Sequence, residues 1–180
     1  MSTRTATSMI PLGSTLATLA TPHGPFSVIE AEGAVLASGW TDDASELTGQ
    51  IHPGLRAATF DRAESSLQPV LDAVARYYDG DFTAPQSITV RQVSGPFRSH
   101  AWDVLRAVEP GAPVTYLEYA MRSGNPTAVR AAAGACAKNA AALFVPCHRV
   151  IRTDGSLGGF RWGLSVKQRL LDFEAGLSPA

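Results

Sequence analysis

Three short segments near the start of the chain are rich in apolar and β-branched residues, and turn-forming sequences separate them. The segments are Thr15–Ala20, Pro25–Ala31 and Ala34–Trp40, with Pro22-His23-Gly24 and Glu32-Gly33 between them. Strands this short, joined by connections of four and two residues, usually pair in antiparallel order. The pattern therefore predicts an antiparallel meander.

After the third predicted strand comes a polar segment, and after that a segment with helical periodicity. Residues Thr41–Thr59 are polar and interrupted by glycine and proline, which predicts a loop. Apolar residues next recur three and four positions apart and predict an amphipathic helix over Ser66–Asp79, which tolerates Pro69 in its first turn and stops at Gly80. Residues Gln86–Val93 are predicted to form one further strand.

A second domain is expected after residue 92. Ser94-Gly95-Pro96 opens a helix that ends near Pro110-Gly111. Its apolar face consists of Phe97, Ala101, Val104, Leu105 and Val108. We therefore predict an N-terminal α/β domain over residues 1–92 and a C-terminal, mostly helical domain over residues 93–180. Residues 1–13 are expected to be a loose leader, in which Met1 and Met9 are alternative starts.

Two short helices joined by a tight turn are predicted next. Thr115 followed by Glu118 has the spacing of a capping box, and the helix it starts stops at Ser123-Gly124. Asn125 can cap a second helix whose first position is Pro126, where the missing N–H costs nothing. This is the outline of a helix-turn-helix.

The second of these helices carries mostly small side chains. Its residues include Ala128, Val129, Ala131, Ala132, Ala133, Gly134, Ala135, Cys136 and Ala137. Such a helix either packs deep in the protein or lets its backbone approach a partner surface closely. Arg130, its one long cation, argues against complete burial because an unpaired buried charge is costly. Cys136, among alanines, is expected to be a small core residue.

The stretch Pro146–Ile151 places a cysteine directly before a histidine. An adjacent imidazole is a common means of activating a thiol near neutral pH, so Cys147 and His148 are candidates for nucleophile and base. By itself the pair is weak evidence, since many cysteines are inert and buried. Ser165 with Gln168 is predicted to cap the last helix, near whose end Glu174 lies.

Composition narrows the class of protein. The chain is 45% hydrophobic and 17% charged, as in a folded globular protein, and it contains no apolar run of the ~20 residues that span a bilayer. Two cysteines and a polar start favour the cytoplasm. His23, His52 and His100 have no neighbouring ligands at metal-binding spacing, so no metal site is predicted.

Charge is distributed unequally between the two halves. Up to residue 90 there are four arginines against ten acidic residues, whereas from Arg91 onward eleven Lys and Arg face six acidic residues. This asymmetry permits a polyanionic partner for the C-terminal half, and solvation of a surface explains it equally well.

From Phe97 to Gly176 the chain resembles the methylated-DNA–protein-cysteine S-methyltransferases, or O6-alkylguanine-DNA alkyltransferases, of the bacterial type. The resemblance rests on Tyr116, Gly124-Asn125-Pro126, Arg130, Asn139, Pro146–Ile151, Gly155, Gly159, Gly163, Lys167, Leu170-Leu171 and Glu174. It implies an N-terminal domain of ribonuclease-H-like form, to which the first half corresponds only in outline, and hence an α+β fold.

The resemblance also implies a reaction. Cys147 takes the alkyl group from O6 of guanine, His148 acts as its base through a water, and Glu174 orients the histidine. Asn139 holds the active-site turn. The thioether is final, so each molecule reacts once and needs no cofactor.

The DNA contacts implied by the resemblance lie on the helix-turn-helix, which enters the minor groove. Arg130 fills the gap left by the extruded nucleotide, and Asn125, Ala128 and Val129 lie beside it at the DNA. Tyr116 turns the target phosphate outward and donates its hydroxyl to the base. The partner is double-stranded DNA containing O6-alkylguanine, the protein is expected to be a monomer, and O4-methylthymine is left open as a substrate.

The substrate pocket implied by the resemblance comprises Tyr116, Val150, Phe160 and Arg161, the last two of which depart from the family pattern. Tyrosine is usual where Phe160 stands, and Arg161 and Trp162 replace smaller residues. Two other functions are alternatives: a module that recognises alkylated DNA without reacting, and a cysteine hydrolase. Relatives of the first kind lack the cysteine, and the family spacing argues against the second.

Overall fold

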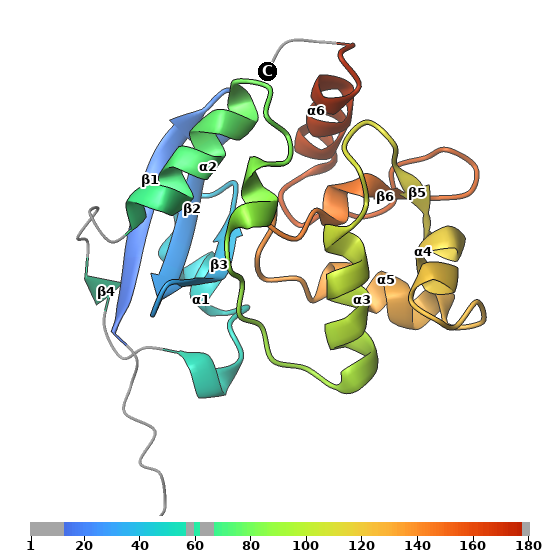
Figure 1. The fold of residues 1–180 in the computed structure, drawn as a ribbon, viewed down its shortest axis with the longest axis horizontal. Helices are drawn as coiled ribbons and strands as arrows, with labels where there is room; N and C mark the ends of the chain where they lie inside the picture. The colour runs from blue at the N-terminus through green and yellow to red at the C-terminus, as the bar shows by residue number, and fades with distance from the viewer. Residues whose placement is uncertain (1–12, 57–59, 62–66, 178–180) are drawn as a thin grey trace, which may run out of the picture.

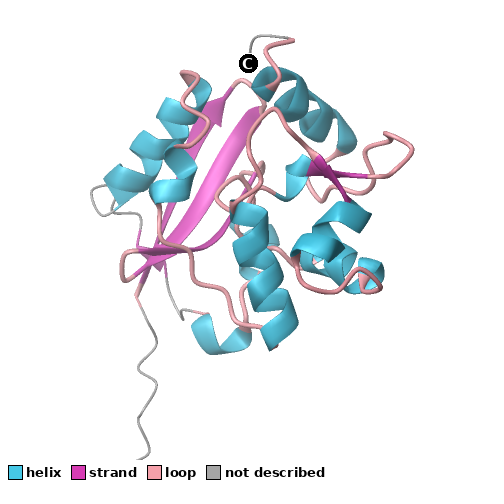
Figure 2. Cartoon of the chain, turned by 45° about the vertical axis from the view of Figure 1, so that its right-hand side comes forward, coloured by secondary structure: helices cyan, strands magenta, loops and turns pink. Residues whose placement is uncertain are grey.

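The computed structural model describes residues 13–56, 60–61 and 67–177 (Figure 1). All but the last residue of the expected leader, and Ser66 at the start of the expected helix, lie outside these ranges. The molecule combines a four-stranded sheet in its first part with a mostly helical second part (Figure 2). The predicted α+β fold class is confirmed.

The first three strands form the predicted antiparallel meander. They are β1 (Ser14–Thr21), β2 (Gly24–Ala31) and β3 (Ala34–Gly39), with Thr15 opposite Glu30 and Val28 opposite Ser38. A short strand, β4 (Phe60–Asp61), runs parallel to β1 and completes the order β3-β2-β1-β4.

Both faces of this sheet are covered. On one face lies α2 (Gln68–Tyr78), whose residues Val70, Val74 and Tyr77 join Phe26 and Val28 in the main hydrophobic cluster (Figure 1). On the other face, α1 (Ala44–Thr48) contributes Leu47 to a smaller cluster. Strand β3 is therefore buried along its whole length, and long apolar side chains on both of its faces stabilise the sheet.

Two predictions for the first half are wrong. The segment expected to be a loop contains α1, which Asp43 caps through Ser45 N–H, and the 3-10 turn η1 (Pro53–Leu55); its residues 57–59 lie outside the described ranges. The expected strand Gln86–Val93 is instead the 3-10 turn η3 (Ala84–Ser87) followed by a single bridge between Val90 and Val35.

The second half contains four helices and a two-stranded parallel pair. The helices are α3 (Pro96–Arg106), α4 (Tyr116–Arg122), α5 (Val129–Ala137) and α6 (Leu164–Glu174). Strands β5 (Val114–Thr115) and β6 (Val150–Ile151) pair with Val114 opposite Val150. The main hydrophobic cluster includes residues of both halves, and the boundary at residue 92 stays a prediction.

Helix starts and ends differ from the predictions in three places. The predicted capping box at Thr115 and Glu118 is present. Helix α5, however, begins at Val129 with Ala128 as its N-cap, because Asn125 instead accepts hydrogen bonds from Thr127 in a preceding turn. Helix α3 ends at Arg106, short of Pro110-Gly111.

The third difference is at the start of α6. Gly163 is its N-cap, and no side chain caps this helix. The predicted capping pair is absent because Gln168 donates to Asp172, one turn further along, at 2.8 Å.

The chain returns to the sheet just before the Cys-His pair. Ser38 N–H donates to Ala140 O at 2.8 Å, Ala142 N–H donates to Ser38 O, and the Ser38 hydroxyl donates to Ala142 O at 2.7 Å. These bonds fix the segment that leads into Cys147 against the free edge of β3. The sheet thus positions the candidate site, which itself lies in the other half.

Candidate active site

Cys147 opens a short 3-10 turn, η4 (Cys147–Arg149), directly after the segment held on β3. Its side chain is 8% exposed and reaches the wall of a cavity of about 1010 Å³. Leu143, four residues earlier, has φ of 76°, a left-handed conformation that a non-glycine residue rarely adopts. A backbone held in this way at the entrance to a reactive group is a feature of functional sites.

His148 and Glu174, the candidate base and the residue expected to orient it, are in contact. His148 Nε2 lies 2.7 Å from Glu174 Oε1, and both side chains are buried. Arg149 donates from Nε and Nη2 to the two oxygens of Glu174, each at 2.9 Å, and from Nη1 to Val108 O. Tyr77 of α2 donates its hydroxyl to Glu174 Oε1 at 2.8 Å. A buried carboxylate is thus held by three side chains from distant parts of the chain.

Burial and the charges of this network together set the protonation state of the histidine. Burial lowers the pKa of His148, even though Glu174 favours the imidazolium form. Burial alone would raise the pKa of Glu174, but His148 and Arg149 together hold it well below its ordinary value. The resting state is therefore a neutral imidazole against an ionised carboxylate. His148 Nδ1 is buried and has no hydrogen-bond partner among the described residues, so it is free to take a proton.

Cys147 rests as a thiol. Burial raises its pKa, and a hydrogen bond with Asn139 and the charge of Lys167 offset only part of that rise. A cysteine in this state needs a base to become a nucleophile. Cys136 lines the same cavity, and burial raises the pKa of its thiol as well.

Asn139 stabilises the turn before the cysteine. Its Nδ2 donates to Val145 O at 2.8 Å, and its Oδ1 accepts from Ala141 N–H and from Gln92 Nε2. The same amide contacts the thiol of Cys147. This placement fits the role that the resemblance gives to Asn139.

The cavity brings together most of the predicted binding residues. Tyr116, Val129, Arg130, Phe160 and Arg161 all line it with Cys147. Burial raises the pKa of Tyr116 to about 12, so its hydroxyl stays protonated and can donate.

Three predicted contacts lie apart from this cavity. Asn125 and Ala128 belong to the exposed turn before α5 and do not line it. Val150 is fully buried in β6, and its carbonyl already accepts from Lys167 Nζ at 2.7 Å.

Sequence reasoning assigned no role to Tyr77, Arg149, Gln92 or Lys167. Lys167 is fully buried and donates to the carbonyls of Val150, Leu157 and Gly159, which holds the loop over the cavity. Its spacing of three and seven residues from Leu170 and Glu174, on one helix face, is a signal that could have identified it. Nothing local in the sequence connects Tyr77 with Glu174.

The described residues contain neither a membrane-spanning helix nor a metal-binding cluster. None of the helices in residues 13–56 and 67–177 is long and apolar enough to cross a bilayer. No cluster of three or more His, Cys, Asp or Glu in the described part of the chain is placed to hold a metal ion.

Comparison with known proteins defines the class. The family described as "6-O-methylguanine DNA methyltransferase, DNA binding domain" matches residues 96–176. The bifunctional transcriptional activator/DNA repair enzyme Ada of Escherichia coli is 37% identical over 82% of this chain, but the match covers only 42% of Ada. A probable methylated-DNA–protein-cysteine methyltransferase of Acanthamoeba polyphaga mimivirus is 37% identical over 61% of this chain and 75% of its own length.

Solved structures agree over nearly the whole chain. The crystal structure of Mycobacterium tuberculosis O6-methylguanine methyltransferase superposes with a TM-score of 0.73 at 25% identity, covering 93% of this chain and 96% of that chain. The chain therefore belongs to the methylated-DNA–protein-cysteine methyltransferase family, as its sequence predicted. It spans less than half the length of Ada and of the similar regulatory protein from Salmonella typhimurium.

Proposed function

We propose that the protein repairs DNA by moving the alkyl group from O6 of guanine to Sγ of its own Cys147, once per molecule. The observation that carries this proposal is the cavity that holds Cys147 together with Tyr116 and Arg130. Behind it, a neutral imidazole is backed by an ionised, buried carboxylate. Family membership supports the same activity.

The proposed chemistry is an in-line displacement. His148 takes the thiol proton through a water, and Sγ of Cys147 attacks the alkyl carbon as the bond from that carbon to O6 breaks. The electron pair of that bond goes to guanine, to which Tyr116 donates a hydrogen bond. The proton taken up by His148 is then passed to guanine, which leaves as the neutral nucleobase. Glu174, held by Arg149, stabilises the imidazolium formed in between. The product is a thioether, which has no route back to the thiol.

Reaching O6 requires the base to leave the stack, at a cost of a few kcal/mol. The small side chains of α5 allow its backbone to approach a minor groove, and Arg130 is exposed and free to occupy the vacated place. The Mycobacterium tuberculosis alkyltransferase solved in complex with DNA has the same fold, with a TM-score of 0.77 at 24% identity. We infer that α4 and α5 bind duplex DNA, with Asn125, Ala128 and Val129 beside Arg130.

The pocket for the flipped base is assigned to Tyr116, Phe160 and Arg161, which line the cavity, whereas Val150, the fourth residue expected there, is buried in β6 and does not line it. We further propose a cytoplasmic, monomeric protein that needs no cofactor. The scheme uses only side chains of this chain and one water.

Labelled substrate tests the proposal directly. A duplex with methyl-labelled O6-methylguanine should leave one label per protein molecule, on the peptide that contains Cys147, when the digest is mapped by mass spectrometry. Cys147→Ala should bind the duplex and accept no label. Cys136→Ala is the matched control, because its thiol lines the same cavity, and it should react normally. Repeated turnover, or label on another residue, contradicts the proposal.

The alternative of a recognition module without chemistry makes the opposite prediction: the wild-type protein binds the lesion but never carries the label. The role of Arg130 is tested separately. Arg130→Ala should slow transfer from paired DNA at least tenfold while leaving transfer from free O6-benzylguanine nearly unchanged. Equal losses on both substrates contradict a role in base flipping.

A further inference from the structure

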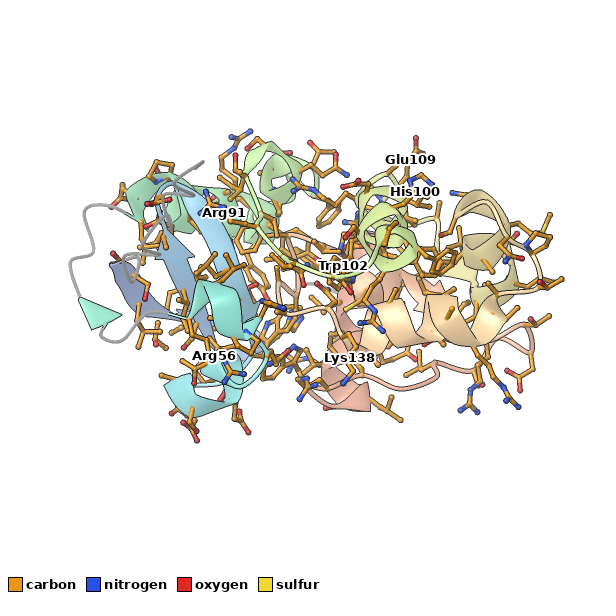
Figure 3. The ribbon with its side chains drawn as sticks, turned by 90° about the horizontal axis from the view of Figure 1, so that it is seen from below. Arg56, Arg91, His100, Trp102, Glu109 and Lys138 are labelled. Atoms are coloured by element: carbon orange, nitrogen blue, oxygen red, sulfur yellow. The ribbon has the colours of Figure 1, made fainter. Side chains whose placement is uncertain are left out.

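A second cleft, of about 310 Å³, lies between the two halves of the molecule. Four cationic side chains line it: Arg56 and Arg91 precede the predicted boundary at residue 92, and Arg98 and Lys138 follow it. Figure 3 shows Arg56 and Lys138 on the same side of the molecule, from opposite halves. No Asp or Glu is among the described residues that line the cleft.

None of these cations has a buried acidic partner in the part of the chain that the structure describes. Arg56 is held by two backbone carbonyls, Ile51 O at 2.9 Å and Gly49 O at 3.2 Å, which leave its positive charge unneutralised. The side chain of Lys138, in an exposed position, makes no hydrogen bond or ion pair with any described residue.

The other two cations are held only weakly. Arg98 donates to the Ser94 hydroxyl at 3.1 Å. Arg91 lies 3.3 Å from Glu32, but both side chains are more than a third exposed, and such surface pairs contribute little.

This arrangement suits a phosphate group. Like charges around one cleft repel each other, and an anion between them relieves that repulsion. Guanidinium groups fixed by hydrogen bonds to the backbone present their remaining donors in a set geometry, which matches phosphate oxygens. Helix α1, whose C-cap Gly49 lines the cleft, carries Glu46 and is capped by Asp43, but neither carboxylate lines the cleft.

The position of Lys138 indicates which molecule supplies the phosphate. It is the C-cap of α5, while Arg130, near the start of the same helix, lines the cavity that holds Cys147. The nine residues of α5 extend about 13 Å at 1.5 Å per residue, or about four steps of 3.4 Å along one strand of a duplex. A duplex whose target base enters the larger cavity therefore has flanking phosphates within reach of the second cleft.

We propose that this cleft binds backbone phosphates of the DNA duplex at a distance of several nucleotides from the alkylated base, so that the N-terminal half takes part in DNA binding through Arg56 and Arg91. The inference rests on the proposed function, because it assumes that α5 lies on DNA. It adds a sequence-independent contact outside the reactive site.

The salt dependence of DNA binding tests this contact. Affinity for an undamaged duplex is measured by fluorescence anisotropy over a series of salt concentrations, for the wild type, Lys138→Gln, Arg91→Gln and the double variant. Each lost phosphate contact should lower the slope of log K against log salt by about 0.9, and the double variant should lose about twice as much. Arg76→Gln is the matched control: Arg76 is an exposed arginine on α2, outside the cleft and paired with Asp81.

Two further measurements keep the outcome clear. Transfer from free O6-benzylguanine, which has no phosphate, should be the same in all variants, and Arg91→Lys should keep the wild-type salt slope. The inference is overturned if the cleft variants have the slope of Arg76→Gln, or if Arg91→Lys loses as much as Arg91→Gln. A wild-type protein that neither binds DNA nor reacts with the free base would instead contradict the proposed function itself.

Discussion

Glu174 connects His148, the proposed base, to the rest of the molecule. Its Oε1 is shared by His148, Arg149 and Tyr77, and only the last of these comes from the N-terminal half. Burial, followed by the negative charge of Glu174, raises the pKa of Tyr77, so that its hydroxyl remains a donor. Each hydrogen bond to the carboxylate reduces its basicity and so limits how strongly it draws a proton onto His148.

Removing the Tyr77 hydroxyl should therefore alter the pH dependence of the reaction. In the wild type, burial holds the pKa of His148 below its ordinary value of 6.5, and transfer should fall only as the pH drops below that value. In Tyr77→Phe, Glu174 becomes more basic and the pKa of His148 rises. The acid limb of the rate profile should then move to higher pH, with a two- to tenfold lower rate near pH 6. Single-turnover transfer measured between pH 5 and 8 gives the profile.

The control for this variant is Tyr119→Phe. Tyr119 is equally buried, and its hydroxyl makes one hydrogen bond, to Ala101 O at 2.7 Å. Both variants should lose about 1 kcal/mol of stability in chemical unfolding. An acid limb that is the same in Tyr77→Phe, Tyr119→Phe and the wild type would show that Tyr77 only supports the fold.

At this scale the sequence indicated the candidate nucleophile and base but not the residues that hold them in place. Cys147 and His148 are adjacent, and Glu174 has a position in a known family pattern. Tyr77 lies 97 residues from Glu174 and looks like any other apolar member of an amphipathic helix. Such a contact depends on how the halves pack, which local patterns do not encode.

At the scale of elements, predictions that rest on a strong local signal are confirmed. Where the signal is weaker, competing contacts decide which structure forms. The capping box of α4 satisfies two backbone groups reciprocally and formed as predicted. The expected strand Gln86–Val93 did not form, because Pro85 starts a 3-10 turn and Arg106 binds the carbonyls of Gln86 and Ile88. Those carbonyls are therefore not available to a neighbouring strand.

The loop over the cavity places Tyr116 through a glycine. Gly158 has φ of +71°, and a β-carbon there would lie 2.9 Å from the Tyr116 hydroxyl oxygen. Gly158→Ala should therefore displace the tyrosine ring and slow transfer from DNA about tenfold or more. Gly155→Ala is the matched control, since its φ is +84° but no atom lies within 4 Å of the added carbon.

Both alanine variants should lose about 1 kcal/mol of stability from backbone strain, measured by chemical unfolding. Only Gly158→Ala should also transfer the alkyl group from DNA more slowly than the wild type. Equal rates of transfer in the two variants would mean that the position of Tyr116 does not limit the reaction.

At the scale of the molecule, the two halves are joined by close packing as well as by the Tyr77 hydrogen bond. Trp162, in the loop before α6, packs against the hydrophobic clusters on both faces of the sheet. Its indole ring lies against Gly39 at the end of β3, so closely that a β-carbon there would overlap with the ring. The glycine is required by this approach, and no local pattern indicates it because the two residues are far apart in the chain.

A double-mutant cycle should measure this packing. Gly39→Ala should destabilise the protein by about 1–3 kcal/mol through overpacking, and Trp162→Ala by a similar amount through lost burial. In the double variant the added methyl group has space, so the combined loss should be smaller than the sum of the single losses by about 1–2 kcal/mol. Chemical unfolding of the four proteins gives the cycle. Additive losses would contradict a direct contact, and would mean that the sheet and the loop before α6 are stabilised independently of each other.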